Sequence, residues 1–266
     1  MLRRSSKPLK SVKVQTQAMA LVSANGEGLR DREDAVPGYD STAWATTTVM
    51  VIGAGGLGGE VSAILARKGV GGLTIFDPDI VEPSNLNRQR FYPQDVGQPK
   101  AVRLANNLKA EATGNTTILG YPWRFEEVIN LGLKLSCEVA VCAVDNDATR
   151  AFCARYFWEH QTPCIMLGVS EDAGRGYVFV QELGKACWCC WHPGAETNLA
   201  VNRCAGATPD ILHVVAGVGT YAIDSLIMPR KRRWNYKEVF LAGDLADGHR
   251  WIEPSANCSV CRGVTP

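Results

Sequence analysis

Short apolar runs alternate along the chain with stretches whose apolar residues recur at helical spacing, and the first clear example begins at residue 49. The β-branched run Val49–Ile52 predicts a buried strand and leads directly into a glycine-rich stretch. After the glycines, Glu60–Gly69 has an apolar helical face and ends on glycine, the residue favoured just after a helix. Leu73–Phe76 predicts a second strand. This order of strand, helix and strand is typical of an α/β domain.

The same two patterns alternate further along the chain. Helices are predicted at Lys100–Glu111, Ala148–Trp158 and Asp210–Met228, and strands at Thr117–Leu119, Glu138–Val144, Cys164–Val169 and Tyr177–Gln181. Two last runs, Glu238–Leu241 and Arg250–Ile252, predict a hairpin that turns at Asp247-Gly248. We therefore expect a doubly wound, mostly parallel, Rossmann-like α/β sheet in residues 48–266. Residues 1–47 show no clear period and predict a partly mobile N-terminal extension, with order beginning at Val49.

The composition excludes several kinds of partner. The 266 residues include 28 Lys+Arg and 27 Asp+Glu, so the chain lacks the global basic field that non-specific nucleic-acid binding requires. Uninterrupted apolar runs such as Val214–Val218 are far shorter than the ~18 residues of a membrane span. The basic first residues are not followed by a secretory apolar region. We expect a soluble, cytoplasmic protein that binds neither nucleic acid nor membrane.

Ten cysteines are the one unusual feature of the composition. Cys187 and Cys190 form one CxxC pair and Cys258 and Cys261 form another, separated by a long intervening segment. Two such pairs supply the four thiolates of a tetrahedral Zn²⁺ site, which would tether the C-terminal segment to the sheet. Cys189 lies inside the first pair and competes with Cys190 as a ligand. A disulfide framework is disfavoured by the length of the chain and by the missing export signal.

The glycine-rich stretch has the spacing of a nucleotide-binding turn. Gly53, Gly55 and Gly58 follow a predicted strand and open a predicted helix, where the backbone approaches phosphate and the helix N-terminus attracts it. Asp77 ends the next strand, where a carboxylate accepts hydrogen bonds from ribose hydroxyls. The commonest bearer of this pattern is an NAD- or FAD-dependent oxidoreductase. A tight turn that binds nothing is the other alternative.

The residues after Asp77 separate these alternatives. The chain continues with SNLNRQ at 84–89 and GQPKA at 97–101, and AVDNDATR follows at 143–150. Together with GAGGLGGEVSAILARKGVGGLTIFDPD and the two CxxC pairs, these segments resemble the ThiF/MoeB/HesA superfamily of adenylating enzymes, which includes ubiquitin-activating proteins. The matching segments span residues 49–261, and dehydrogenases do not carry this combination.

The resemblance implies that a carboxylate oxygen of the substrate attacks the α-phosphorus of ATP and releases pyrophosphate. A carboxylate is already a nucleophile, so the obstacle is crowded negative charge, which cations and Mg²⁺ relieve. Arg88 and Lys100 supply positive charge at the triphosphate, and Asp145 resembles the family's Mg²⁺ ligand. Taken one at a time, these side chains would be read as solvated surface charges. The nucleotide-binding set that the resemblance implies is Gly53, Gly55, Gly56, Gly58, Asp77, Asp79, Asn85, Arg88, Gln89 and Lys100.

Cys204 is a candidate catalytic residue of a different kind. It lies in a polar, glycine-containing loop before the helix predicted at Asp210–Met228, where several relatives keep a catalytic cysteine. Its neighbour Arg203 favours the thiolate, which takes the acyl group from AMP as a thioester. The alternative is adenylation alone, as in MoeB-like members, with Cys204 of no consequence. The resemblance also assigns the zinc site to Cys187, Cys190, Cys258 and Cys261.

The expected substrate is a ubiquitin-like or sulfur-carrier protein that ends in Gly-Gly, and a ubiquitin-conjugating-type enzyme is a second possible partner. Residues 168–176 correspond to the segment that covers the substrate tail in relatives. A peptide-maturation adenylase is a less favoured alternative. Relatives form homodimers in which an N-terminal arginine reaches the partner's nucleotide, and we expect a homodimer here. That segment is not recognisable, and Arg30 and Arg32 are its nearest candidates, although both lie among acids.

Two alternatives belong to other functional classes. One is an NAD-binding oxidoreductase, which SNLNRQ and Lys100 disfavour. The other is a zinc-stabilised scaffold without catalysis. A scaffold of this kind would be expected to lose the polar and charged site residues, but Asp77, Asn85, Arg88, Lys100 and Asp145 are all present, which disfavours it.

Overall fold

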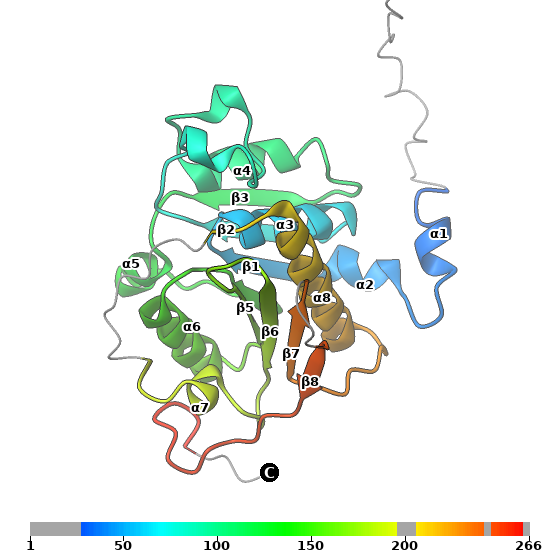
Figure 1. Cartoon of the computed structure of the whole chain (residues 1–266). Helices are drawn as coiled ribbons and strands as arrows, with labels where there is room; N and C mark the ends of the chain where they lie inside the picture. The colour runs from blue at the N-terminus through cyan, green and yellow to red at the C-terminus, as the bar shows by residue number, and fades with distance from the viewer. Residues whose placement is uncertain (1–27, 196–205, 242–245, 263–266) are drawn as a thin grey trace, which may run out of the picture.

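The computed structural model describes residues 28–195, 206–241 and 246–262, and its centre is a mixed eight-stranded sheet (Figure 1). The order across the sheet is β3-β2-β1-β4-β5-β6-β7-β8. The strands are β1 Thr48–Ile52, β2 Gly72–Phe76, β3 Thr117–Tyr121, β4 Val139–Cys142, β5 Cys164–Val169, β6 Arg175–Gln181, β7 Tyr236–Phe240 and β8 Gly248–Arg250. The first five positions in this order pair in parallel and the last three pairings are antiparallel, which confirms the mostly parallel, Rossmann-like fold.

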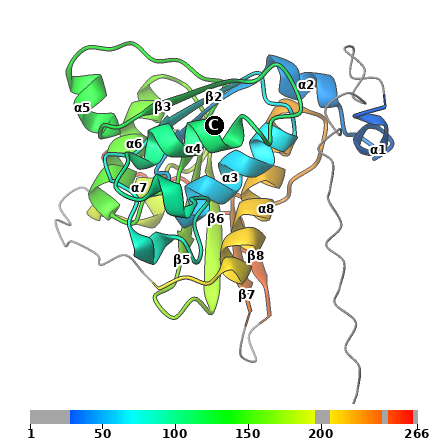
Figure 2. The ribbon, with the colours of Figure 1, turned by 90° about the horizontal axis from the view of Figure 1, so that it is seen from above.

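Helices cover both faces of the sheet (Figures 1 and 2). They are α1 Asp31–Asp34, α2 Ser41–Thr46, α3 Gly56–Arg67, α4 Lys100–Leu108, α5 Phe125–Asn130, α6 Asp147–Glu159, α7 Trp188–Trp191 and α8 Pro209–Ile227. Helices α3, α4 and α8 contribute to one buried cluster and α5, α6 and α7 to another. Strand β1 serves both, because Val49 and Val51 face the first cluster while Met50 and Ile52 face the second.

The described structure starts earlier than the sequence indicates. Order was expected from Val49, but α1 and α2 precede it, and the side chain of Trp44 in α2 is fully buried. Helix α3 also begins at Gly56, four residues before the predicted start, since its first turn consists mostly of glycines with weak helix propensity. The expected mobility of the first residues concerns positions 1–27, which lie outside the described residues.

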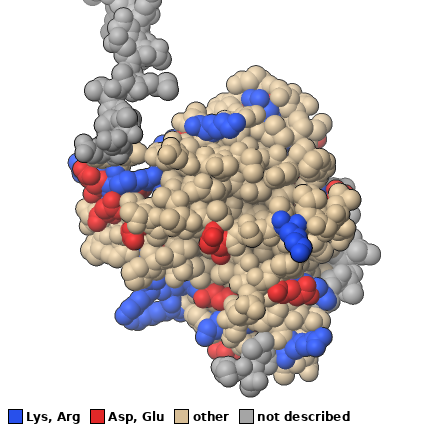
Figure 3. All heavy atoms as spheres, turned by 180° about the vertical axis from the view of Figure 1, so that it is seen from behind, with Lys and Arg blue, Asp and Glu red and all other residues tan. Residues whose placement is uncertain are grey.

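Helix α8 is long and apolar enough to cross a membrane by length and composition, a property that counting uninterrupted apolar runs did not reveal. Half of the apolar stretch of this helix is buried inside the structure, and the helix packs against α3, β5 and β6. In this fold it is therefore a core helix. Figure 3 shows positive and negative side chains interspersed on the face opposite to that of Figure 1, in agreement with the nearly balanced composition.

A buried carboxylate joins the N-terminal segment to the core. Asp224 on α8 is 2% exposed and lies 2.6 Å from Lys68 Nζ and 2.9 Å from Arg230 Nη1. It also accepts a hydrogen bond of 3.2 Å from Trp44 Nε1 in α2. The ammonium of Lys68 lies over the rings of Trp44 and Tyr39. One anion thus holds two cations and the indole of α2 against α3 and α8.

Asp224→Asn is expected to lower the free energy of unfolding by about 3 kcal/mol, because it leaves the cations of Lys68 and Arg230 without their buried counter-charge. Urea titration followed by circular dichroism measures the change. The matched control is Asp210→Asn on the exposed first turn of the same helix, expected to cost less than about 1 kcal/mol. Equal losses in the two variants would contradict the role assigned to Asp224.

Candidate active site

A deep cleft opens at the carboxyl ends of β1, β2 and β4. Its volume is about 940 Å³. The chain moves outward from β1 to β3 and then returns to β4 on the other side of β1, so the loops after β1 and β4 diverge. Such a reversal of strand order is where open α/β sheets bind their ligands. The site therefore follows from the connectivity of the sheet.

The turn between β1 and α3 requires glycine at two positions. Gly53 has φ +100°, and a Cβ there would lie 2.8 Å from the carbonyl oxygen of Ala143 in the loop after β4. A Cβ on Gly58 would lie 1.8 Å from the Gly53 oxygen, so only glycine lets α3 start this close to β1. Gly55 faces open space, which leaves its backbone and the N-terminus of α3 accessible from the cleft.

Asp77 holds this turn in place. Its Oδ2 accepts a hydrogen bond of 2.6 Å from Ala54 N and its Oδ1 accepts one of 2.8 Å from Asp79 N. Burial raises the pKa of the Asp77 carboxyl, although both backbone donors oppose that shift. The carboxylate predicted to contact ribose thus lines the cleft and also positions the glycine turn.

The SNLNRQ segment forms one wall of the cleft. The 3₁₀ turn η2 (Pro83–Asn85) opens it, and Asn85 Oδ1 accepts a hydrogen bond of 2.9 Å from Glu82 N. Asn85 is buried, so it shapes the wall as well as facing the cleft. Arg88 Nη1 donates to the carbonyl oxygen of Ser84 at 2.7 Å, which holds its guanidinium against the same turn. The carbonyl oxygen of the Gln89 side chain is buried without a hydrogen-bond partner in the described structure.

Lys100 enters the cleft from the first residue of α4. Its Nζ lies 2.9 Å from Asp79 Oδ2, and its side chain is 11% exposed whereas that of Asp79 is 62% exposed. The Lys100 backbone N–H also donates to the Asp79 carbonyl oxygen at 2.9 Å. These two contacts fix the ammonium beside the end of β2. A partly buried cation held in this way is positioned to meet an anionic ligand.

Asp145 lies on the opposite side of the cleft, in the loop after β4. The next residue, Asn146, caps α6 by accepting a hydrogen bond of 2.9 Å from Thr149 N. Arg150 holds the same loop from within: its Nε donates to the carbonyl oxygen of Val144 at 3.1 Å and its Nη2 to that of Leu167 at 3.0 Å. The loop that carries Asp145 is thereby tied to β5.

Sequence reasoning assigned no role to Arg150. It stands in AVDNDATR, but only Asp145 was assigned a role within that segment. The guanidinium is almost fully buried and lines the cleft. The available signal was its place in the motif, since Arg150 follows directly after the Asp145 loop in the first turns of α6. Its burial depends on partners that only the folded chain provides.

Most of the predicted site residues meet in this cleft. They are Gly53, Gly55, Gly56, Asp77, Asp79, Asn85, Arg88, Gln89, Lys100 and Asp145. Gly58 is not part of the lining and acts through the packing of α3. Cys204 lies outside the described residues.

The two arginines considered as nucleotide ligands lie elsewhere. Arg30 donates to the Arg67 carbonyl oxygen at 3.0 Å and to Thr113 Oγ1 at 2.7 Å, so it caps the end of α3 remote from the cleft. It also pairs with Glu33 at 2.7 Å, whereas Arg32 is exposed. In the described chain neither lines the cleft.

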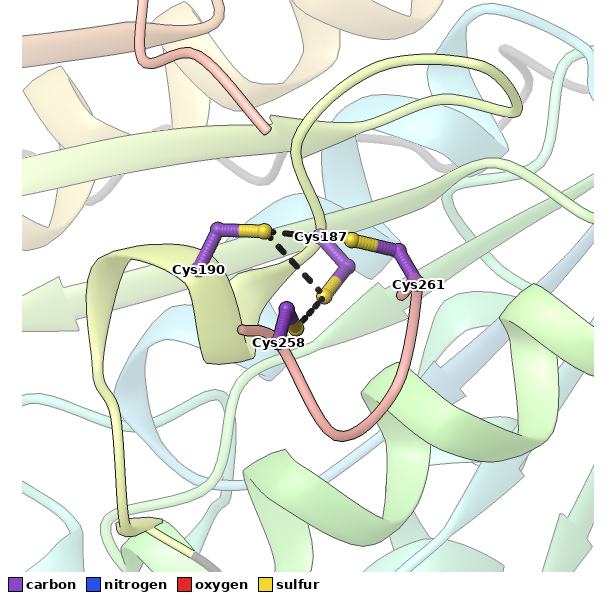
Figure 4. A group of neighbouring side chains, drawn as sticks. All are labelled: Cys187, Cys190, Cys258 and Cys261. Atoms are coloured by element: carbon purple, nitrogen blue, oxygen red, sulfur yellow. Dashed lines mark hydrogen bonds between the residues drawn. The ribbon is translucent and has the colours of Figure 1, made fainter. Parts of the chain in front are cut away.

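The two CxxC pairs converge on one point (Figure 4). The Sγ atoms of Cys187, Cys190, Cys258 and Cys261 all lie within 4.8 Å of one another. Individual Sγ–Sγ distances are 3.8 Å for Cys187–Cys190, 3.3 Å for Cys187–Cys258 and 3.2 Å for Cys190–Cys261. Tetrahedral zinc with Zn–S bonds of about 2.3 Å places its sulfurs about 3.8 Å apart. Cys189, which competes in the sequence, is not part of this group.

The chemistry of the four thiols also fits a metal. Hydrogen bonding to Cys187 and burial raise the pKa of the Cys190 thiol to about 12, and burial raises the pKa of Cys258. Thiols whose pKa is raised in this way form thiolates most readily beside a bound cation. The donor set and its geometry therefore suit Zn²⁺.

Comparisons with known proteins agree with this architecture. The ThiF family model matches residues 33–253. Adenylyltransferase and sulfurtransferase MOCS3 of Caenorhabditis briggsae is 31% identical over 166 residues, which cover 59% of this chain and 39% of MOCS3. ATP-dependent ubiquitin transferase-like protein Cap2 of Escherichia coli (strain TW11681) is 24% identical over 279 residues, covering 95% of this chain and 46% of Cap2. The chain thus spans less than half the length of both curated relatives.

Among solved structures, the chain resembles the MccB of E. coli determined with ATP. The TM-score is 0.70 at 19% sequence identity, over 83% of this chain and 68% of that chain. This likeness concerns the fold. Because the family model covers most of the sequence and the fold agrees with it, the chain belongs to the ThiF family.

Proposed function

We propose that this chain is an ATP-dependent adenylating enzyme that activates the C-terminal carboxylate of a ubiquitin-like or sulfur-carrier protein. The observation that carries the proposal is the convergence of the glycine turn, Arg88, Lys100 and Asp145 in one cleft at the carboxyl ends of β1, β2 and β4. The relatives support it: MOCS3 is named an adenylyltransferase, and MccB has been solved with ATP.

The proposed reaction needs charge neutralisation rather than proton transfer. One oxygen of the substrate carboxylate attacks the α-phosphorus, a new O–P bond forms, and the bond from that phosphorus to the bridging oxygen breaks. Pyrophosphate leaves with the electron pair, and the product is an acyl adenylate. No proton moves in this step, so the protein's task is to bring two anions together and to hold the departing pyrophosphate.

The described residues divide this task among them. Lys100, fixed by Asp79, and Arg88, fixed on the SNLNRQ turn, offer positive charge to the phosphates from one wall. The accessible N-terminus of α3 adds its unpaired N–H groups and its dipole. Asp145 on the opposite wall would hold Mg²⁺, which neutralises phosphate charge when bound.

Alternatives from other classes fit the site less well. A dinucleotide-dependent oxidoreductase uses the same glycine turn, but it does not require cations and a metal-binding carboxylate on facing walls of the cleft. A non-catalytic scaffold would not need Lys100 to be held in a partly buried position beside Asp79. Both cations and Asp145 face the cleft together, as activation of a carboxylate demands.

The substrate is proposed from the names of the relatives and from the chemistry of the site. Cap2 is described as ubiquitin transferase-like, MOCS3 also as a sulfurtransferase, and solved MccB structures contain MccA. We favour a carrier that ends in Gly-Gly, acted on by a cytoplasmic homodimer, with thioester transfer to Cys204 and then to a conjugating-type enzyme. Adenylation without the thioester is the second candidate.

Zinc is proposed as the structural ion of the four-cysteine cluster. All four positions of a tetrahedral ion would be filled by Cys187, Cys190, Cys258 and Cys261, which leaves no position for substrate. When bound, zinc would cross-link α7 to the segment after β8, two parts of the chain separated by about seventy residues.

Lys100→Ala is expected to lower carrier-dependent ATP–pyrophosphate exchange at least about a hundredfold, because a fixed cation is lost from the phosphate site. The exchange is measured with a panel of Gly-Gly-ended carriers and without carrier. Lys109→Ala at the exposed end of α4 is the matched control and should exchange normally. Normal exchange in Lys100→Ala would contradict the assignment.

Asp145→Asn should raise the Mg²⁺ concentration needed for half-maximal exchange.

Cys204→Ala is expected to retain pyrophosphate exchange and to lose a covalent adduct with the carrier. Intact mass spectrometry without reductant should show a species with the summed mass of the wild-type chain and the carrier, less the mass of one water. Dithiothreitol should remove this adduct. Cys137→Ala is the control, because burial raises the pKa of that thiol to about 12 and makes it unreactive. Exchange by the wild type with no adduct would favour adenylation alone.

Purified wild type is expected to contain about one zinc per chain, and Cys258→Ser less, with a lower thermal midpoint. Inductively coupled plasma mass spectrometry gives the stoichiometry, and differential scanning calorimetry gives the midpoint. Cys153→Ser is the control, because it removes a buried thiol that lies outside the four-cysteine cluster. This variant should contain as much zinc as the wild type. Full zinc content in Cys258→Ser would exclude Cys258 as a ligand.

A further inference from the structure

A second, smaller pocket opens beside the cleft and has no part in the proposed chemistry. We call it the aromatic pocket, because its walls are Tyr177, Trp188, Trp191, His192 and Tyr236. Asp147, Val169 and Tyr177 line both this pocket and the main cleft, so the two spaces are adjacent. Its volume of about 260 Å³ lies below the roughly 300–1,000 Å³ of sites for whole small molecules. The size suits one side chain.

The aromatic walls are packed against one another and are preformed. Ring centroids lie 4.5 Å apart for Trp191 and Tyr236 and 5.0 Å apart for Trp188 and Trp191. Trp191 also meets His192 at 4.2 Å. Rings locked in edge-to-face contacts of this kind offer a guest apolar surface without first being ordered.

The four-cysteine cluster fixes the position of these walls. Trp188 and Trp191 belong to α7, which begins directly after Cys187 and also contains Cys190. The backbone N–H of Trp188 donates to Gln181 Oε1 at 3.1 Å, which joins α7 to β6. The four-cysteine cluster and the pocket therefore share one structural element, α7.

The charged groups around the pocket are of both signs: Asp147, Arg175 and Glu238 line it, and two further arginines lie against its rings. The guanidinium of Arg150 lies 5.7 Å from the ring centroid of Tyr177 and 5.5 Å from that of Trp188, and Arg250 lies 4.7 Å from that of Tyr236. Arg175 at the rim lies 3.4 Å from Glu238 and offsets its charge. Cations already lie over three of the rings while Asp147 and Glu238 line the pocket, so charges of both signs surround the space and a neutral guest meets no uncompensated repulsion.

We propose that the aromatic pocket binds a neutral aromatic side chain of the substrate's C-terminal tail, upstream of the carboxylate that is adenylated. The proposal rests on the proposed function, since the pocket lies next to the cleft and a tail whose end reaches the cleft passes the residues that line both. A tail whose end lies at the α-phosphorus enters past Val169 and Tyr177, the residues shared by the two spaces. The pocket then selects among carriers that end alike in Gly-Gly.

Synthetic peptides test this directly on the zinc-loaded full chain. Acetylated peptides ending in Gly-Gly carry 4-fluorophenylalanine, alanine or lysine at each upstream position in turn. Binding is measured by fluorine NMR and calorimetry, with and without ATP, independently of turnover. We expect a fluorophenylalanine peptide to bind about tenfold more tightly than its alanine counterpart at one position, with a shifted fluorine resonance.

Trp191→Ala should remove that tenfold preference and leave binding of the alanine peptide unchanged. Trp251→Ala is the matched control, an exposed tryptophan outside the pocket, and should keep the preference. Trp191→Phe should restore most of it, and unchanged zinc content shows that α7 is intact. A preference that survives Trp191→Ala, equal affinity for all peptides, no detectable binding, or tightest binding of lysine would each overturn the proposal.

The outcome is separable from that of the proposed function. Aromatic peptides that bind through Trp191 but never support pyrophosphate exchange would uphold the pocket and count against adenylation. Carrier-dependent exchange without a preference for aromatic peptides would support adenylation and count against the aromatic pocket as a binding site for the tail.

Discussion

The close contact between the glycine turn and the loop after β4 is the constraint on which the site depends. Gly53 adopts φ +100° with its Cα beside the carbonyl of Ala143, and Gly58 lies over the Gly53 oxygen. No side chain larger than glycine fits there, so α3 begins directly at the mouth of the cleft. Asp77 then fixes the turn through its hydrogen bond from Ala54 N. The residues proposed to meet a nucleotide are placed relative to this contact.

Two rigid attachments extend this arrangement across the sheet. Arg150 ties the Asp145 loop to β5 through the carbonyl oxygens of Val144 and Leu167. On the far side, the four cysteines hold α7, and α7 holds the aromatic walls beside the same cleft. The buried Arg150 also lies against the rings of Tyr177 and Trp188, so the loop of Asp145 and the pocket share one support.

Much of the fold was predictable because its signals are local. The glycine spacing, the strand at Cys164–Val169 and the two CxxC pairs follow from short-range patterns, and the structure contains all three. The start of α3 was misplaced because glycine carries no helix signal. Helices α1 and α2 were missed because they are short and are held by distant contacts, such as that of Trp44 with Asp224. Likewise, no sequence period indicates that Arg150 reaches β5 or that Trp191 meets Tyr236, since both contacts depend on the folded sheet.

Transfer of an oxygen isotope from the substrate carboxylate shows whether a carboxylate oxygen attacks the α-phosphorus of ATP in this cleft. A carrier that supports exchange is labelled with ¹⁸O in its C-terminal carboxylate and incubated with ATP, Mg²⁺ and the zinc-loaded enzyme. The AMP released after the adenylate is consumed is then analysed by mass spectrometry. We expect one ¹⁸O in the phosphate of AMP, because the bridging oxygen of the acyl adenylate comes from the carboxylate. Unlabelled AMP, or ¹⁸O in inorganic phosphate with ADP as the other product, would contradict it.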